Sequence, residues 1–155
     1  TGPILRASGV DWDLRKTRPY GIYQELDFES IVGTGEMGTL GDCWDRYYVR
    51  MKEMNESLKI IRQCLEGIEE GPIQGKVSKI VKVPAGEIYM RTECPRGELG
   101  YHLISDGGKI PYRLKVKSSC FTHTAMLSHM APGQMIADFV ASIGSIDIVL
   151  GEVDR

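Results

Sequence analysis

Apolar side chains recur at alternating spacings of three and four residues through one long stretch of the chain. This spacing places them along one side of an α-helix, as in a helix bundle or coiled coil. Asp42 suits the start of such a helix and Gly71-Pro72 ends it. We predict a helix of about 40 Å, at ~1.5 Å per residue, whose partner helices lie outside this chain. The apolar positions are Trp44, Tyr47, Met51, Met54, Leu58, Ile61, Leu65 and Ile68, and the opposite side carries Arg50, Lys52, Glu53, Arg62 and Glu66.

Three shorter segments predict a small antiparallel sheet after a linker over 72–85. Glu87–Glu93 alternates roughly, Glu98–Ser105 leads into the turn signal Asp106-Gly107-Gly108, and Tyr112–Lys117 alternates cleanly. Two further helices are predicted over Phe121–Met130 and Gln134–Ser145, separated by Pro132-Gly133.

Residues 1–41 show little periodicity, and we expect a long connection ordered by its aromatic residues. The predicted class is therefore α+β, with helices dominant, in one domain over 1–155.

Composition narrows the classes of function. The chain has 155 residues, 42% of them hydrophobic, and a net charge of −2, which gives no reason to expect a nucleic-acid partner. No apolar run reaches the ~20 residues of a membrane span. The start at Thr1-Gly2-Pro3 lacks the features of a signal peptide and an initiator Met, so we expect a fragment. The four cysteines have no zinc-site spacing, and we interpret them as reduced structural thiols of a cytosolic protein.

Two groups of polar residues are candidates for chemistry. Arg96 lies next to Gly97 between two predicted strands, where a backbone can approach a cofactor closely and the arginine supplies a fixed charge, or where a simple surface hairpin forms. Asp147, Glu152 and Asp154 follow the last predicted helix, either as a solvated tail or as carboxylates paired with Arg96 or Arg155. The three histidines, His102, His123 and His129, suit a proton relay or ordinary structural positions, and no spacing makes a triad.

Several long motifs together resemble one known family. GPILRASGVDWDLRK, GDCWDRYYVRM, PRGELGYHLISDGGKIPYRLKVKSSCF and ADFVASIGSIDIVLGEVDR, in this order, are similar to the D subunit of NADH:quinone oxidoreductase, respiratory complex I. That family is homologous to the large subunit of nickel–iron hydrogenases, and the resemblance covers only the C-terminal part of the family protein. It implies a hydrogenase-large-subunit-like fold.

The resemblance gives the tail a specific meaning. In hydrogenases the matching terminus reads Asp-Pro-Cys-x-x-Cys-x-x-His, and its two cysteines hold the metal centre. This chain has Val149 and Glu152 at the cysteine positions and Arg155 at the histidine position. The soft ligands are replaced, so we expect no bound metal. The resemblance implies that Asp147, Val149 and Arg155 line the inner end of a quinone chamber, and that Arg96 lies near the terminal iron–sulfur cluster, which a neighbouring subunit binds.

The resemblance also implies partners and a location. The cluster-bearing small subunit, other peripheral-arm subunits and membrane-arm subunits are the expected protein partners, quinone is the substrate, and another subunit handles NAD(H). The location implied is the cytoplasmic side of the inner (plasma) membrane, without a transmembrane segment.

The linker between Gly71 and Pro84 is shorter than in many mitochondrial-type members, which leaves NADH, ferredoxin or a deazaflavin open as electron donor. The headgroup-binding His and Tyr of the family lie in the absent N-terminal half, so this chain alone should not reduce quinone. A structural scaffold that only holds the cluster-bearing partner is the alternative function, and a metal-dependent hydrogenase is disfavoured by the missing cysteines.

Overall fold

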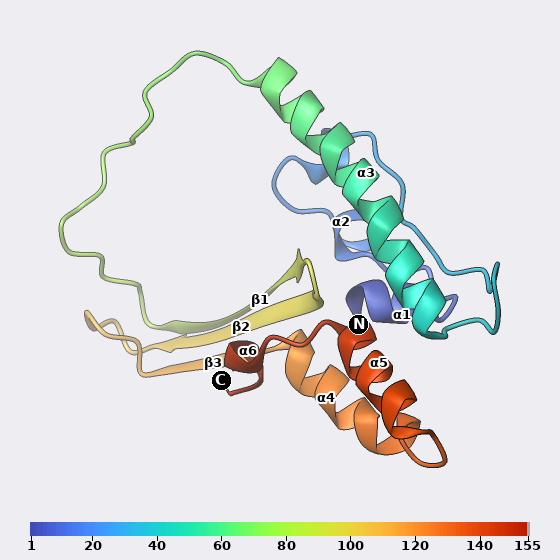
Figure 1. Cartoon of the computed structure of the whole chain (residues 1–155). Coiled ribbons are helices and arrows are strands. Elements are labelled where there is room, and N and C mark those ends of the chain that lie inside the picture. The colour runs from blue at the N-terminus through green and yellow to red at the C-terminus, as the bar shows by residue number, and fades with distance from the viewer. Residues whose placement is uncertain (155) are drawn as a thin grey trace.

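The computed structural model describes residues 1–154 and shows an α+β arrangement in which a long helix, a three-stranded sheet and a helical pair surround a small core (Figure 1). The helices are α1 (Gly2–Ala7), α2 (Leu14–Thr17), α3 (Cys43–Gly67), α4 (Ser119–Met130), α5 (Ile136–Ile146) and α6 (Leu150–Val153), with a 3₁₀ turn η1 (Tyr23–Glu25). The strands are β1 (Gly86–Cys94), β2 (Gly97–Ser105) and β3 (Arg113–Lys117), antiparallel in the order β1-β2-β3. The predicted α+β class, long helix and sheet are confirmed.

Helix α3 begins where the sequence predicts it. The Asp42 carboxylate accepts a hydrogen bond from the Asp45 amide at 2.9 Å, the N-cap interaction that satisfies one of the free amides at a helix start. The helix ends at Gly67, four residues before the predicted Gly71. Residues 68–85 then run as an exposed connection without helix or strand, here called the strap, which describes a wide arc in Figure 1.

The prediction of a connection over residues 1–41 is only partly correct, because the segment contains α1, α2 and η1. Helix α1 packs against α3 and β2. Its Gly2 lies against Gly97, where a Cβ on Gly97 would come within 2.9 Å of the Thr1 carbonyl carbon. Both glycines have positive φ angles, of 64° and 129°. The close backbone approach expected at Gly97 is therefore made by this chain's own N-terminal segment.

The buried apolar core is small, and charged residues share it. The nearly inaccessible apolar residues are Ala7, Leu14, Leu26, Phe28, Val49, Cys120 and Ile146. Arg6, Asp13 and Asp45 are each only 1% exposed. Among the expected aromatic anchors, Phe28 is buried and forms an edge contact with Tyr23, whose ring also meets that of Tyr20. This core joins the N-terminal segment to the first half of α3 and also includes Cys120 of α4 and Ile146 of α5.

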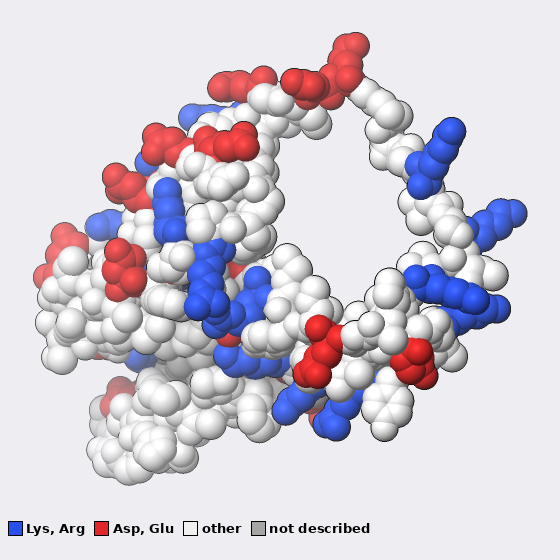
Figure 2. Space-filling view, turned by 180° about the vertical axis from the view of Figure 1, so that it is seen from behind, with Lys and Arg blue, Asp and Glu red and all other residues white. Residues whose placement is uncertain are grey.

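The charges of the surface are unevenly distributed. Figure 2 shows a lobe almost free of red and blue, which corresponds to α4 and α5. Asp138 is the only Asp, Glu, Lys or Arg between residues 119 and 146. The strap, in contrast, carries Lys76, Lys79 and Lys82 along its arc. No helix within residues 1–154 is both long and apolar enough to cross a membrane.

Candidate functional site

Arg96 and Asp147 come together although 51 residues separate them. The tight turn between β1 and β2 presents Arg96, and Asp147 follows directly after α5. The Arg96 Nε–H donates a hydrogen bond of 2.9 Å to the Asp147 carbonyl oxygen, and Nε lies 3.6 Å from the Asp147 carboxylate. Both side chains stay partly exposed, at 27% and 46%. The pair is therefore held by the backbone yet remains accessible to a ligand.

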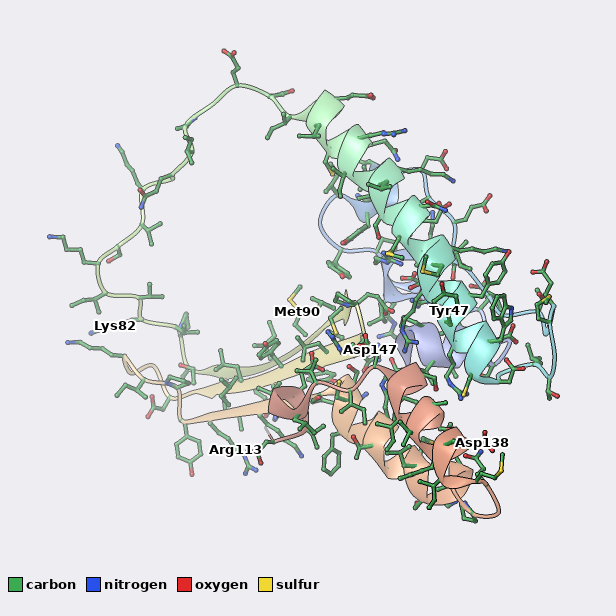
Figure 3. The ribbon with its side chains drawn as sticks, viewed as in Figure 1. Tyr47, Lys82, Met90, Arg113, Asp138 and Asp147 are labelled. Atoms are coloured by element: carbon green, nitrogen blue, oxygen red, sulfur yellow. The ribbon has the colours of Figure 1, made fainter. Side chains whose placement is uncertain are left out.

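Asp147 ends α5 in the left-handed conformation, with φ 50° and ψ 57°. Aspartate tolerates this region better than most residues because its short polar side chain can bond locally. The bend turns the chain away from α5 just where the carbonyl groups of a helix end carry partial negative charge. In Figure 3, Asp147 lies at this turn, between the end of the β1–β2 hairpin and the lower half of α3.

Two arginines of α3 stabilise the same helix end. Arg50 Nη1–H donates to the Ser145 carbonyl at 2.6 Å, and Arg46 Nε–H donates to the Ser145 hydroxyl at 2.8 Å. Cations at a helix C-terminus are favourable. Sequence reasoning missed this role, because it placed Arg50 only on the side of α3 opposite the apolar positions. The available signal was the spacing of four between Arg46 and Arg50, which puts both on one side of the helix.

A cleft of about 620 Å³ opens beside this cluster, within the usual size range of small-molecule sites. Its lining is mixed: Met51 and Met54 of α3 are apolar, whereas Arg50 of the same helix and Asp147 are polar. The Arg50 Nε–H is buried without a hydrogen-bond partner, and burial lowers the pKa of Arg50 against the opposing effect of Asp147. This N–H is therefore unpaired, but it is buried and not exposed to the cleft.

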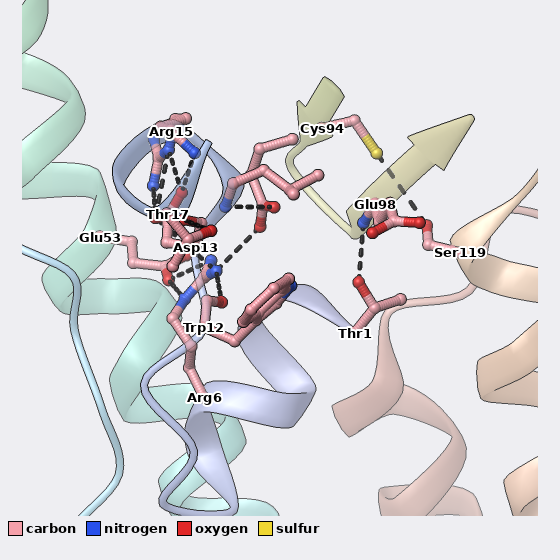
Figure 4. Close-up of polar contacts among 12 residues, drawn as sticks. Thr1, Arg6, Trp12, Asp13, Arg15, Thr17, Glu53, Cys94, Glu98 and Ser119 are labelled. Carbon is pink, nitrogen blue, oxygen red and sulfur yellow. Dashed lines mark hydrogen bonds and ion pairs between the residues drawn. The ribbon is translucent and has the colours of Figure 1, made fainter. Parts of the chain in front are cut away.

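A buried ionic cluster around Arg6 also contributes to the lining of the cleft (Figure 4). Arg6 lies 2.7 Å from Glu53, 2.8 Å from Glu93 and 3.7 Å from Asp13, and it also donates to the Trp12 carbonyl at 3.0 Å. Burial opposes the charge of Arg6, but the three carboxylates outweigh burial and raise its pKa. Burial likewise raises the pKa of Asp13, and Arg15, at 2.6 Å, outweighs it and lowers that pKa overall.

The other predicted tail residues lie apart from the cleft. The Val149 amide points to the Cys120 sulfur at 3.5 Å, and the Ser119 hydroxyl donates weakly to Glu152 at 3.4 Å. Neither Val149 nor Arg96 is among the residues that line the cleft, although the neighbouring Asp147 and Pro95 are. Arg155 lies outside the described residues. The structure thus joins Arg96 to Asp147 and places Val149 against α4.

The histidines and cysteines are dispersed. His102 forms a 2.6 Å contact with Glu87 on the sheet, and His123 is buried with one ring nitrogen 3.0 Å from the Thr1 carbonyl oxygen. All four cysteines are free, and the Cys120 thiol has a pKa raised by burial. Within residues 1–154, no group of three or more His, Cys, Asp or Glu side chains is placed to hold a metal ion.

The sequence profile of one protein family, described as respiratory-chain NADH dehydrogenase, 49 Kd subunit, matches residues 1–82 and 75–155. The chain belongs to this family. The two matches together cover the whole chain and overlap within the strap.

Individual relatives agree. The chain is 52% identical over 155 residues to the second D subunit of the NADH-quinone oxidoreductase of Solibacter usitatus, covering 100% of this chain and 40% of the relative. It is 52% identical over 159 residues to the D subunit of the same enzyme in Chlorobaculum tepidum, covering 100% of this chain and 40% of that relative. It is 46% identical over 180 residues to that of Anaplasma marginale, covering 100% and 44%. The chain therefore spans about two-fifths of the length of these relatives and corresponds to their C-terminal part.

Proposed function

We propose that this chain is the C-terminal part of a quinone-reducing subunit in a proton-translocating NADH:quinone oxidoreductase. In this role it helps to wall the quinone chamber beside the iron–sulfur cluster of a partner subunit. Family membership supports the oxidoreductase. The observation that carries the chamber is the Arg96–Asp147 pair next to a 620 Å³ cleft with a mixed apolar and polar lining.

The cleft suits the chemistry of a quinone. A quinone headgroup is a flat ring with two carbonyl acceptors, so it fits between an apolar surface and a few hydrogen-bond donors. Met51 and Met54 supply polarizable apolar contacts, and Arg50 supplies a positive charge to the lining. Asp147 can exchange protons with a reduced ring, and Arg96 supplies a fixed positive charge beside it.

The wider assignment follows from the same proposal. Residues 1–155 belong to one domain like the large subunit of nickel–iron hydrogenases, with the metal ligands replaced. Quinone is the substrate, another subunit handles NAD(H), and the cluster is bound by the neighbouring small subunit. The other peripheral-arm and membrane-arm subunits complete the assembly at the cytoplasmic side of the inner (plasma) membrane. The family resemblance also assigns Val149 and Arg155 to the chamber, although Val149 itself lies against α4 and not in the cleft.

The substitution Val149→Met in the full-length subunit, within its assembled complex, tests the tail. A longer side chain at a chamber wall reduces the room for a ring, so we expect a several-fold change in the KM for quinone and in the potency of a quinone-site inhibitor. The control is Val77→Met in the strap, which should change neither. If assembly is intact and Val149→Met also changes neither, the tail has a structural role and Val149 does not line the chamber.

A structural scaffold is the competing function, favoured by the buried ionic cluster around Arg6, which needs no ligand to explain it. A scaffold predicts that replacement of Arg96 leaves turnover unchanged once the complex has assembled.

A further inference from the structure

A second pocket lies at the opposite end of β2 from Arg96. Its volume is about 740 Å³, and it is lined by the strap and by the turn between β2 and β3. The strap contributes Lys76 and Lys82, and the turn contributes Lys109. In Figure 3, Lys82 lies where the strap comes close to this turn. Among the described residues that line this pocket, here called the strap pocket, none is an Asp or Glu.

Hydrogen bonds fix the end of the strap to the sheet. The Ser105 hydroxyl of β2 donates to the Val83 carbonyl oxygen at 2.9 Å and accepts from the Gly107 amide at 3.1 Å. Val81 and Val83 also line a small cavity together with Leu103 of β2. The end of the strap is therefore held beside the turn, although the strap contains no helix or strand.

The positive charges of the strap pocket have no countercharge in the described part of the chain. The lysines that form ion pairs within residues 1–154 are Lys59 and Lys117, neither of which lines the pocket. Residues 71–86 contain no Asp or Glu, and Figure 2 shows blue without red along this part of the strap. Asp106, in the turn, accepts a hydrogen bond from the Gly108 amide at 2.9 Å and does not line the pocket. Like charges gathered in one place repel one another, and a bound anion relieves this repulsion.

Exposed apolar side chains accompany the lysines. Ile80 and Val81 line the strap pocket and are 53% and 62% exposed. Ile110 and Tyr112, in the turn, are 80% and 75% exposed. A free phosphate ion needs only the cations, whereas a phospholipid presents a phosphate next to apolar chains. Cationic, aliphatic and aromatic side chains together are typical of surfaces that bind the interfacial region of a membrane with anionic lipids.

We propose that the strap pocket binds the phosphate head group of an anionic membrane lipid. Lys76, Lys82 and Lys109 bind the phosphate as point charges, and Ile80 and Val81 contact the apolar part of the same lipid. The pocket and the candidate site lie at opposite ends of β2, so this binding goes beyond the quinone chamber and does not depend on it. It gives the chain a contact with the membrane surface that needs no spanning helix.

Flotation of the full-length subunit with lipid vesicles tests this proposal. The vesicles contain phosphatidylcholine with phosphatidylglycerol, and vesicles of phosphatidylcholine alone serve for comparison. One variant combines Lys76→Gln, Lys82→Gln and Lys109→Gln, and because all three side chains are exposed the substitutions should leave the fold intact. Lys109→Gln alone is the milder variant if circular dichroism shows that the triple variant does not fold.

The matched control removes the same number of positive charges elsewhere on the surface. It combines Arg18→Gln, Lys52→Gln and Arg62→Gln, at exposed positions outside the strap. A further sample contains inorganic phosphate at the phosphate concentration of the vesicles, which distinguishes a lipid head group from a free anion.

We expect the parent subunit to bind the vesicles with phosphatidylglycerol much more tightly than those without it. Each lysine beside an anionic surface contributes about a fivefold change in affinity, so Lys109→Gln should lose about fivefold and the triple variant about 100-fold. The matched control should stay within about threefold of the parent, because exposed charges far from the contact are screened by salt.

An equal loss of binding in the matched control would show only a general effect of charge and would overturn the proposal. So would equal binding with and without phosphatidylglycerol, complete displacement by inorganic phosphate, or failure of the parent subunit to bind either kind of vesicle.

Discussion

Arg6 joins three carboxylates that come from three different elements of the chain. Asp13 caps α2, Glu53 lies on α3 and Glu93 lies on β1. The Arg6 side chain is only 2% exposed, and those of Asp13 and Glu93 are 0% and 4% exposed. Removal of one partner from such a cluster leaves uncompensated charge in a poorly solvated place, which costs far more than the loss of a surface pair.

Arg6→Gln should therefore destabilise the subunit strongly. We expect a loss of about 3–5 kcal/mol in the free energy of unfolding, measured by urea denaturation of the full-length subunit. Arg18→Gln is the matched control, because Arg18 is exposed, and it should leave the midpoint unchanged. Equal midpoints for the two variants would mean that the Arg6 cluster does not hold these elements together.

The buried His123 makes the free energy of unfolding depend on pH below 6.5. Burial lowers the pKa of His123 from 6.5 to about 4. Below pH 6.5 the unfolded chain binds a proton that the folded chain does not, so stability is full above pH 6.5 and falls toward pH 4, by about 1.4 kcal/mol per pH unit.

The substitution His123→Gln should flatten the dependence of unfolding free energy on pH between 6.5 and 4. His129→Gln, at an exposed position near the end of α4, should retain the parent dependence. Denaturant titrations at several pH values measure both. An unchanged slope for His123→Gln would show that other groups cause the acid sensitivity.

At the scale of elements, the sequence predicts helices and strands that have a periodic pattern and misses the short helices. The three-and-four spacing predicts α3 to within a few residues, and alternation with turn residues predicts all three strands. Helices α1 and α2, of six and four residues, are too short to show a period. They form because their residues pack against α3 and the sheet, which no local pattern reveals.

The cap of α3 is a prediction at this scale. Asp42 accepts from Asp45, so Asp42→Ala should cost about 1 kcal/mol of stability, whereas Asp42→Asn, which keeps an acceptor oxygen, should retain most of it. Thermal unfolding of the full-length subunit measures both variants. A similar loss for Asn and Ala would mean that the charge of Asp42, rather than the cap, is what matters.

At the scale of the whole molecule, α3 buries mostly charged side chains against the rest of the chain and leaves its apolar side chains exposed. The apolar positions from Trp44 to Ile68 predict partner helices outside this chain, and the structure leaves these positions exposed. The sequence could not predict that the charged side is the buried one, because the countercharge for Glu53 is Arg6, 47 residues away. For the same reason the sequence did not reveal that Arg50 binds the end of α5, 95 residues later.

For the candidate site too, the sequence identifies single residues, and the structure supplies their arrangement. The family motifs identify Arg96 and Asp147 as candidate site residues, and their pairing and the cleft become visible only when distant segments are placed in space. The function of the site therefore depends on whether this cluster acts on quinone or only joins β1 to α5.

Replacement of Arg96 in the assembled complex distinguishes these possibilities most directly. The measurement compares quinone reduction by Arg96→Gln with that by Arg113→Gln, an exposed arginine on the opposite face of the sheet, after equal assembly has been verified. The loss of a charge-assisted interaction of about 1.5–3 kcal/mol predicts a fall in kcat/KM for quinone of about 10–100-fold for Arg96→Gln alone. Full activity of an assembled Arg96→Gln complex would contradict the chamber assignment and favour the scaffold.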